Sequence, residues 1–177
     1  GGLPLGLGAG AGVGDRVALS VVGTDRLAPA SGYFQAKLTQ ESLISSGPVP
    51  YTLVRATQFF EFLSTIADSA TVDNTVSLPP ALIQPMASAD VAEGIALAAV
   101  AAPVNGIIEI GGPEPFRLDE VIRTALTARG DARRVVSDPT ARYWGIAIGE
   151  RTLIPAEGAG LFDTRLADWI LETAARL

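Results

Sequence analysis

The chain has 177 residues with 13 basic and 19 acidic side chains, a formal net charge of −6, and neither His nor Cys. Its composition therefore excludes a Ser-His-Asp or Cys-His nucleophile, a thiol redox pair, a disulfide framework and a zinc site of imidazole and thiolate ligands. The acidic balance and the lack of a basic cluster argue against a nucleic-acid surface or a polybasic membrane patch. A hydrophobic fraction of 48% predicts a packed core.

Residues 1–16 are predicted to form a flexible, glycine-rich lead-in, since alternate glycines give too much backbone freedom for a helix or strand. The alternative is a phosphate loop, because Gly6-x-Gly8-x-x-Ala11 fits a relaxed dinucleotide fingerprint. That fingerprint needs a strand before it and a helix after it, whereas here a strand follows. The first residue is Gly1 rather than Met, which suggests a fragment or a processed chain.

Short apolar runs alternate with amphipathic segments along the rest of the chain. Strands are expected at 17–22, 50–55, 107–110 and 133–136, and helices at about 31–45, 58–67, 88–101, 118–128 and 162–177. Such alternation indicates an α/β fold with a parallel sheet and flanking helices. The first run is almost wholly apolar, which is typical of a strand buried on both faces.

Two details of the helix expected at 88–101 can be predicted. Ser88 is expected to be its N-cap, because a hydroxyl can accept a hydrogen bond from the first turn. The apolar stretch 95–104 is about half the length of a membrane span, so it is expected to be a buried helix rather than a membrane segment.

The only lysine, Lys37, lies four residues after Tyr33. Four residues make one helical turn, so the ammonium and the phenol are expected on one face of the helix. A cation near a phenol favours phenolate, and such a Tyr can exchange a proton with a carbonyl or hydroxyl substrate. The alternative is a surface lysine beside an interfacial tyrosine.

Ser20 lies near the end of the first expected strand, at the edge where open α/β sheets bind ligands. Its hydroxyl could hydrogen-bond a substrate oxygen, or it could be a core hydroxyl bonded to the backbone. Asp90 and Glu93 could suggest a metal or acid pair, but a carboxylate in a first helical turn ordinarily pairs with the helix dipole. No metal site is therefore expected.

Aromatic and glycine-rich features have weaker functional interpretations. Phe59, Phe60 and Phe62 could line a pocket, although two of the three are expected to belong to the core. Trp144 and Trp169 are expected to be packing residues. The sequence Gly-Gly-Pro at 111–113 is expected to end a strand rather than cradle a phosphate.

Three segments in succession resemble the short-chain dehydrogenase/reductase superfamily, and most closely its atypical, NmrA-like NAD(P)-binding branch. They are Leu19-Ser-Val-Val-Gly23, Tyr33-Phe-Gln-Ala-Lys37 and Pro50-Tyr-Thr-Leu-Val-Arg-Ala-Thr57. The segments 84–92 and 109–113 are also similar to the C-terminal half of those proteins, so the resemblance covers about residues 17–130. The order of the segments is more specific than any one of them.

The resemblance implies a partial doubly wound, Rossmann-like parallel sheet, with residues 17–177 as the C-terminal part of an NAD(P)-binding domain with small substrate-side segments. It implies that Ser20 orients the substrate, that Tyr33 is the acid/base, and that Lys37 holds the nicotinamide ribose. The residues implied to lie along the nicotinamide are Ala56, Thr57, Gln58 and Phe59. The implied cofactor is NAD(P), with NADP as the expected form.

Two departures from the family pattern stand out. In many relatives the second strand ends Arg-Pro, whereas here it ends Arg55-Ala56, which places the local loop shape in question. The family's N-terminal glycine-rich strand-turn-helix is replaced by residues 1–14, so the sequence shows no binding site for the adenine and pyrophosphate of the cofactor.

The expected function is an NAD(P)-dependent oxidoreductase that acts on a small-molecule carbonyl or alcohol, in the cytoplasm, present as a C-terminal fragment. One alternative is an NmrA-like sensor that binds the dinucleotide without turnover, and another is a stub that binds nothing. Neither nucleic acid nor membrane is expected as a partner. Self-association through an exposed sheet edge is also predicted.

Overall fold

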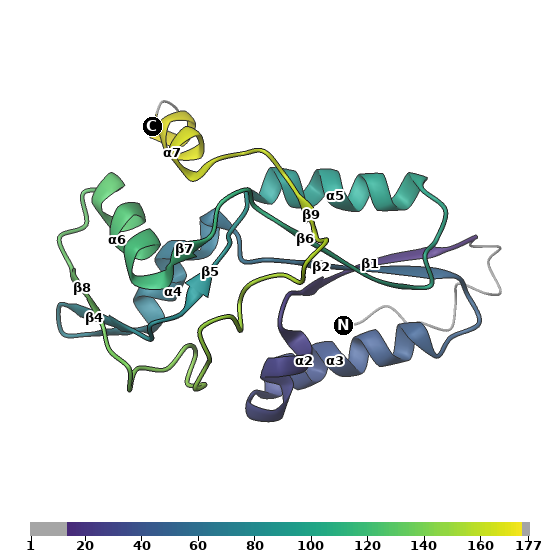
Figure 1. Ribbon diagram of the computed structural model, residues 1–177, viewed down its shortest axis with the longest axis horizontal. Helices are drawn as coiled ribbons and strands as arrows, with labels where there is room; N and C mark the ends of the chain where they lie inside the picture. The colour runs from purple at the N-terminus through teal and green to yellow at the C-terminus, as the bar shows by residue number, and fades with distance from the viewer. Residues whose placement is uncertain (1–13, 175–177) are drawn as a thin grey trace.

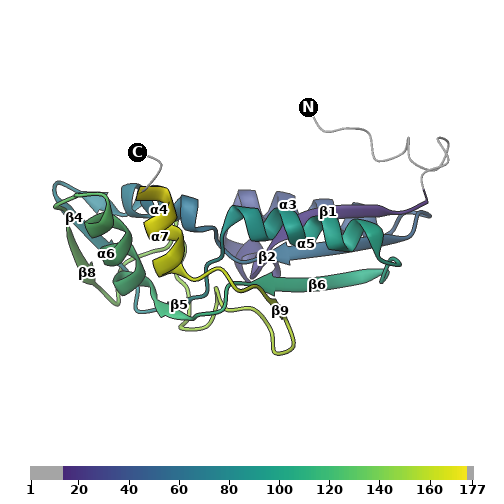
Figure 2. The ribbon, with the colours of Figure 1, turned by 90° about the horizontal axis from the view of Figure 1, so that it is seen from above.

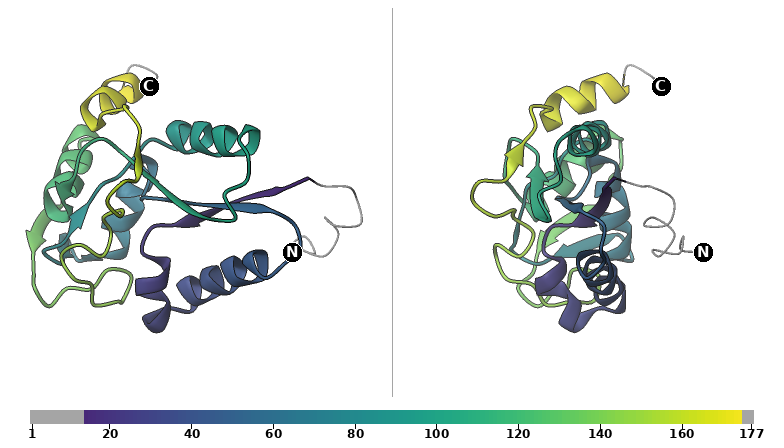
Figure 3. Two further views of the ribbon diagram at one scale, coloured as in Figure 1. Left: turned by 45° about the vertical axis from the view of Figure 1, so that its right-hand side comes forward. Right: turned by 90° about the vertical axis from the view of Figure 1, so that its right-hand side faces the viewer.

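The computed structural model describes residues 14–174. Its central sheet has four parallel strands in the order β1-β2-β6-β9. These strands are β1 (Arg16–Val21), β2 (Tyr51–Ala56), β6 (Gly106–Gly111) and β9 (Gly160–Leu161). Helix α3 (Gly32–Ser45) covers one face of the sheet and α5 (Ser88–Val100) the other, as the end-on view in Figure 3 shows. The predicted parallel α/β class is therefore confirmed.

A second lobe lies beyond the carboxyl ends of these strands (Figures 1 and 2). It contains a three-stranded sheet in the order β3-β4-β8, a two-stranded sheet of β5 and β7, and helices that pack around them. The strands are β3 (Thr71–Val72), β4 (Thr75–Leu78), β5 (Leu82–Ile83), β7 (Phe116–Arg117) and β8 (Arg134–Ser137). The helices are η2 (Phe60–Phe62), α4 (Leu63–Ser69), α6 (Leu118–Ala128) and α7 (Leu166–Ala174).

Most expected elements are found within one or two residues of their predicted bounds. Several short elements were not predicted: α2 (Thr24–Leu27) and η1 (Ala28–Ala30) fill the connection before α3, and β5 lies within the expected extended connection. Strands β3, β4 and β7 were not predicted either. The last helix begins at Leu166 rather than 162, because the chain before it pairs with β6 as β9. The alternative phosphate loop and most of the expected lead-in, 1–16, lie outside the described residues; of the remainder, Arg16 is the first residue of β1 rather than part of a lead-in.

The prediction that the first strand is buried on both faces is wrong. β1 is an edge strand of the described sheet, and its Leu19 side chain is 37% exposed. The doubly buried strand is β2, where the five residues after Tyr51 are all buried. The physical reason is position, because β2 lies between β1 and β6 and is covered by helices on both faces.

Two predictions about the helix at 88–101 are also wrong. The apolar stretch 95–104 is not buried as a whole: Val100 is 85% exposed and Leu97 more than half, because α5 is an outer layer that buries only its sheet-facing side. The N-cap of α5 is Ala87, and Ser88 is the first helical residue. The Ser88 hydroxyl instead donates to the Glu61 carboxylate at 2.7 Å.

The end of β6 passes very close to a neighbouring loop. A Cβ atom at Gly112 would lie 2.0 Å from the backbone oxygen of Pro85. The Gln84 side chain fixes the same contact, since its Nε2 donates to the Gly112 carbonyl at 2.7 Å. The expectation that the Gly-Gly-Pro sequence ends a strand agrees with this geometry, because Gly111 is the last residue of β6.

The hydrophobic core is divided between the two parts of the molecule. The larger cluster fills the second lobe and extends to Leu27 and Phe34. The smaller one lies between the central sheet and α5, and contains Val54, Met86 and Ile110. Among residues 14–174, no helix is both long and apolar enough to cross a bilayer.

Candidate functional site

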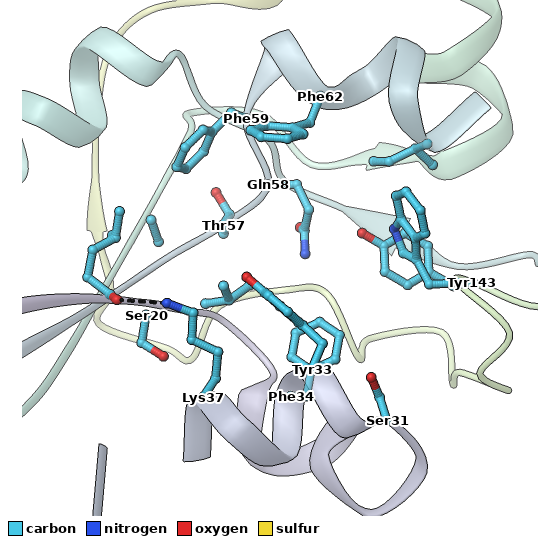
Figure 4. Close-up of a pocket in the computed structure, with 15 residues that line it drawn as sticks. Ser20, Ser31, Tyr33, Phe34, Lys37, Thr57, Gln58, Phe59, Phe62 and Tyr143 are labelled. Carbon is cyan, nitrogen blue, oxygen red and sulfur yellow. Dashed lines mark hydrogen bonds between the residues drawn. The ribbon is translucent and has the colours of Figure 1, made fainter. Parts of the chain in front are cut away.

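A cavity of about 660 Å³ opens where β1 and β2 end, between the N-terminal turn of α3 and the second lobe (Figure 4). This is the carboxyl edge of the parallel sheet, where open α/β folds bind their ligands. The volume lies within the usual range for small-molecule sites. The residues that line it are Leu19, Ser20, Val21, Ser31, Tyr33, Phe34, Lys37, Ala56, Thr57, Gln58, Phe59, Phe62, Ile66, Tyr143 and Trp144.

The structure brings Tyr33 and Lys37 together at this cavity. Both come from the first two turns of α3, and Figure 4 shows the phenol hydroxyl and the ammonium directed toward the same region. The Lys37 ammonium donates only long hydrogen bonds, at 3.5 Å to the Leu19 carbonyl and 3.4 Å to the Gln40 side chain. An ammonium has three donors, so it retains the capacity to bind a further oxygen. Tyr33 is 60% exposed, which leaves its hydroxyl accessible to a ligand and to water.

Ser20 also borders the cavity, but its hydroxyl is engaged by another residue. The side chain is 3% exposed and donates a hydrogen bond to Glu41 Oε1 at 2.5 Å. A hydroxyl has one proton and two lone pairs, so Ser20 can at the same time only accept a hydrogen bond. Its partner is therefore a buried carboxylate rather than the backbone.

Glu41, the partner of Ser20, is itself part of a buried ion pair with Arg55. Arg55, at the end of β2, donates from Nε and Nη2 to Glu41 at 3.0 and 2.7 Å, and from Nη1 to Asp25 at 3.0 Å. The hydrogen bond to Glu41 raises the pKa of Arg55 above its usual value. Because Glu41 lies two turns after Tyr33, this pair fixes α3 against the sheet. Sequence reasoning missed Glu41, although the spacing 33, 37, 41 continues one helical face.

The four residues predicted to lie along a nicotinamide all line the cavity. Their backbone is held on both sides: Thr57 N–H donates to Ile110 O at 3.0 Å, and Met86 N–H donates to Gln58 O at 2.9 Å. The Thr57 hydroxyl is buried without a hydrogen-bond partner among the described residues. Unpaired buried polar groups are costly, so this segment fits a ligand that carries both donors and acceptors, such as a nicotinamide carboxamide.

A tight turn that the sequence analysis did not single out completes the cavity. Tyr143 and Ile146 exchange two backbone hydrogen bonds of 2.9 Å, with Trp144 and Gly145 at the corner. Trp144 has φ 50° and Gly145 φ 79°, the left-handed pair of a two-residue hairpin turn. Burial raises the pKa of Tyr143 to about 12, so this phenol stays neutral.

The aromatic predictions are confirmed in part. Trp169 packs in the core at 5.5 Å from the Phe60 ring, but Trp144 is 49% exposed at the cavity and is not a packing residue. Phe60 is buried, Phe59 packs against the smaller core cluster while it also lines the cavity, and Phe62 is half exposed there.

Asp90 and Glu93 were considered above as a metal or acid pair, and the structure gives Asp90 a different partner. Asp90 is buried, and its Oδ1 accepts a hydrogen bond from the Thr164 hydroxyl at 2.8 Å. No group of three or more potential metal ligands occurs among the residues that the structure describes.

No protein-family model matches the chain, and no curated protein matches it in sequence. Solved structures do match. An NADPH-dependent quinone oxidoreductase from Escherichia coli has a TM-score of 0.63 at 17% identity, over 94% of this chain and 70% of that one. The UDP-glucose 4-epimerase of Thermus thermophilus, in complex with NAD, has a TM-score of 0.57 at 18% identity, over 83% and 59%. An NAD-dependent NDP-hexosamine 5,6-dehydratase of tunicamycin biosynthesis has a TM-score of 0.62 at 15% identity, over 97% and 65%.

The chain has a Rossmann-type fold. At these identities the likeness shows the fold alone, and the chain spans 59% to 70% of the length of these three proteins. The cavity described above lies at the carboxyl edge of that fold's parallel sheet. The first of these proteins is NADPH-dependent, the second was solved in complex with NAD, and the third is NAD-dependent.

Proposed function

We propose that the chain is the C-terminal part of an NAD(P)-dependent oxidoreductase of the atypical short-chain type, which interconverts a carbonyl and an alcohol and uses NADP. The observation that carries the proposal is the convergence of Tyr33 and Lys37 on one cavity, opposite the unpaired hydroxyl of Thr57. The NADPH and NAD dependence of proteins with this fold supports a nicotinamide cofactor.

The proposed roles follow from where each group lies. Lys37 binds the nicotinamide ribose through its free donor capacity, and Thr57 and Gln58 hydrogen-bond the carboxamide. A bound dihydronicotinamide supplies the hydride. Lys37, Thr57 and Gln58 are thus the residues, among 14–174, that we propose bind the nicotinamide end of the cofactor.

Tyr33 is proposed to move the proton. As the carbonyl carbon gains hydride, its oxygen takes the phenolic proton of Tyr33, and the product is the alcohol. The neighbouring ammonium of Lys37 stabilises the phenolate that forms, and water reaches the exposed Tyr33 to restore the proton. Ser20 accepts a hydrogen bond from the alcohol, since its own proton is bound by Glu41.

A second candidate is a sensor of the NmrA-like type that binds the dinucleotide without turning it over. The engagement of Ser20 by Glu41 favours it, because Ser20 then has no proton to donate to a substrate carbonyl. The two candidates share the cofactor site and differ only in whether Tyr33 performs chemistry.

The test combines binding and turnover on the full chain. NADPH and NADH are titrated by nicotinamide fluorescence, and oxidation of NADPH is followed with a panel of aldehydes, ketones and quinones. Tyr33→Phe is expected to lower kcat by about 100-fold or more while the Kd for NADPH stays the same. Lys37→Met is expected to raise that Kd by about tenfold. Tyr51→Phe, at the opposite end of β2, is the matched control and should change neither value.

Three results decide between the candidates. An effect of Tyr33→Phe on kcat alone supports the oxidoreductase. Binding of NADPH without oxidation of any carbonyl supports the sensor. No binding of either nucleotide at millimolar concentration overturns both.

A further inference from the structure

The cavity wall is almost devoid of charge. Fifteen described residues line it, and Lys37 is the one charged side chain among them. Most of the others are aliphatic or aromatic. Phe59 and Phe62 form an edge-to-face pair with ring centres 5.7 Å apart, and Tyr143 and Trp144 form another at 6.5 Å. We call Phe59, Phe62 and Trp144 the aromatic wall.

The arginines are elsewhere, although the chain has twelve of them. None of the described arginines lines the cavity. Arg55 is bound to Glu41, and Arg26 donates to the Ile154 carbonyl at 3.2 Å. Proteins hold diphosphates with arginine forks, lysines or helix N-termini. With Lys37 used for the cofactor, only the start of α3 could attract an anionic substrate.

Trp144 occupies an unfavourable backbone conformation. A residue with a bulky side chain rarely adopts a positive φ, and the corner of such a turn normally holds Asn, Asp or Gly. Trp144 nevertheless has φ 50° there, and about half of its surface is exposed at the cavity. Strain of this kind tends to persist at functional sites. The indole contacts the Tyr143 ring edge-to-face, and its exposed surface is available to a ligand.

Resting on the proposed function, we propose that the substrate is an uncharged, flat aromatic carbonyl compound that packs against the aromatic wall, with Trp144 as a specificity-determining residue. Its carbonyl points toward Tyr33. Reduction forms one C–H bond from the hydride of dihydronicotinamide and one O–H bond from the Tyr33 proton, so that the carbonyl gains two electrons and NADPH becomes NADP⁺. The half-exposed rings of Phe62 and Trp144 would be buried on binding, which supplies the apolar contribution to affinity.

The test uses 2-naphthaldehyde, decanal and UDP-glucose as probes. The chain has two tryptophans, so Trp169→Phe leaves Trp144 as the only indole reporter. In that variant 2-naphthaldehyde is expected to quench the emission saturably without any cofactor, and UDP-glucose is expected to leave it unchanged at 1 mM, about a thousand times a micromolar Kd. Trp144→Asn suits the turn and should not lower Tm. It should reduce kcat/KM for 2-naphthaldehyde about five- to tenfold and leave decanal unaffected.

The outcomes separate this inference from the proposed function. A selective loss with 2-naphthaldehyde and an unchanged or raised Tm supports it. Equal loss with both aldehydes, or tight binding of UDP-glucose, overturns the substrate class, while the effect of Tyr33→Phe on kcat still upholds the oxidoreductase. Saturable quenching without reduction of any carbonyl means that the proposed function has failed, and the inference about a substrate fails with it.

Discussion

The Ser20 hydroxyl donates a 2.5 Å hydrogen bond to the Glu41 carboxylate, across the contact between β1 and α3. Arg55 occupies both oxygens of the same carboxylate from β2. One buried group thus joins two strands to the helix that carries Tyr33 and Lys37. The orientation of Tyr33 and Lys37, which are the proposed acid/base and the proposed ribose-binding group, depends on this contact.

Glu41→Gln is expected to destabilise the protein strongly. Glu41 and Arg55 are both buried, and removal of the Glu41 charge leaves the Arg55 guanidinium with only the exposed Asp25 and, at 3.9 Å, Glu109 as acidic partners. The free energy of unfolding should fall by about 3 kcal/mol, as measured by urea denaturation. Adding Arg55→Met should recover part of the loss, because it removes the buried positive charge that Glu41 no longer balances. The control is Glu120→Gln, in an exposed pair with Arg117, which should cost less than about 1 kcal/mol. Equal losses at both positions would contradict the prediction.

Thr57→Val is expected to act on stability and on binding in opposite directions. The Thr57 hydroxyl is buried and unpaired, so its replacement by a methyl group should leave the free energy of unfolding unchanged or raise it by up to about 1 kcal/mol. If Thr57 binds the cofactor, the Kd for NADPH should rise about five- to tenfold. Thr52→Val is the matched control: its hydroxyl accepts a hydrogen bond from Val104 N–H at 3.2 Å, far from the cavity. Thr52→Val should lower the free energy of unfolding and leave the Kd for NADPH unchanged. A higher Kd in Thr52→Val with an unchanged Kd in Thr57→Val would refute the role of Thr57.

Tyr143 makes the stability of the protein dependent on alkaline pH. Burial raises its pKa to about 12 in the folded state, whereas a tyrosine in an unfolded chain titrates near 10. The unfolded state therefore loses its proton first, and the free energy of unfolding falls as pH rises from about 10 to about 12. The loss should be roughly 1 to 3 kcal/mol. Urea denaturation at pH 8, 10 and 11 measures it, and Tyr143→Phe should flatten the slope. An identical slope in the variant would show that other groups are responsible.

The exposed edge of β1 leads to a prediction about self-association. β1 is paired on one side only among residues 14–174, and an unpaired strand edge can bind a second strand. Sedimentation velocity should show a sedimentation coefficient that rises with concentration. Ala18→Lys, which places a charge on the edge strand, should suppress this rise, and Val100→Glu on the outer face of α5 should not. If only Val100→Glu suppresses it, the helix face is the interface. A coefficient independent of concentration would contradict the prediction.

The sequence predicted the elements whose signals are local. The apolar period of α6, with Leu118, Val121 and Ile122 on its buried side, set its bounds, and the apolar run of β2 did the same. The exposure of Leu19 and Val100 was missed because it depends on which layers cover each element. That information is in the topology rather than in the residue pattern.

Part of the candidate site was equally accessible to sequence reasoning. The four-residue spacing of Tyr33 and Lys37 placed both at the cavity, and the segment after β2 was found by resemblance. Trp144 was predicted to be a packing residue, and its place at the cavity was missed, because contact between a turn and a distant sheet edge leaves no periodic signal. The one available hint was the glycine that follows it, which marks a corner where an aromatic side chain would be unusual.

The contact between Gly112 and Pro85 has a consequence for redesign of the cavity. A Cβ at Gly112 has no room beside the Pro85 carbonyl oxygen, so the loop after β6 and the loop before α5 are interlocked at backbone level. The second of these loops also holds the Gln58 carbonyl through Met86. Libraries aimed at new ligand preferences should therefore leave Pro85, Met86 and Gly112 untouched and vary Phe62 and Trp144, whose side chains are about half exposed, with Asn, Asp or Gly favoured at position 144 by its positive φ.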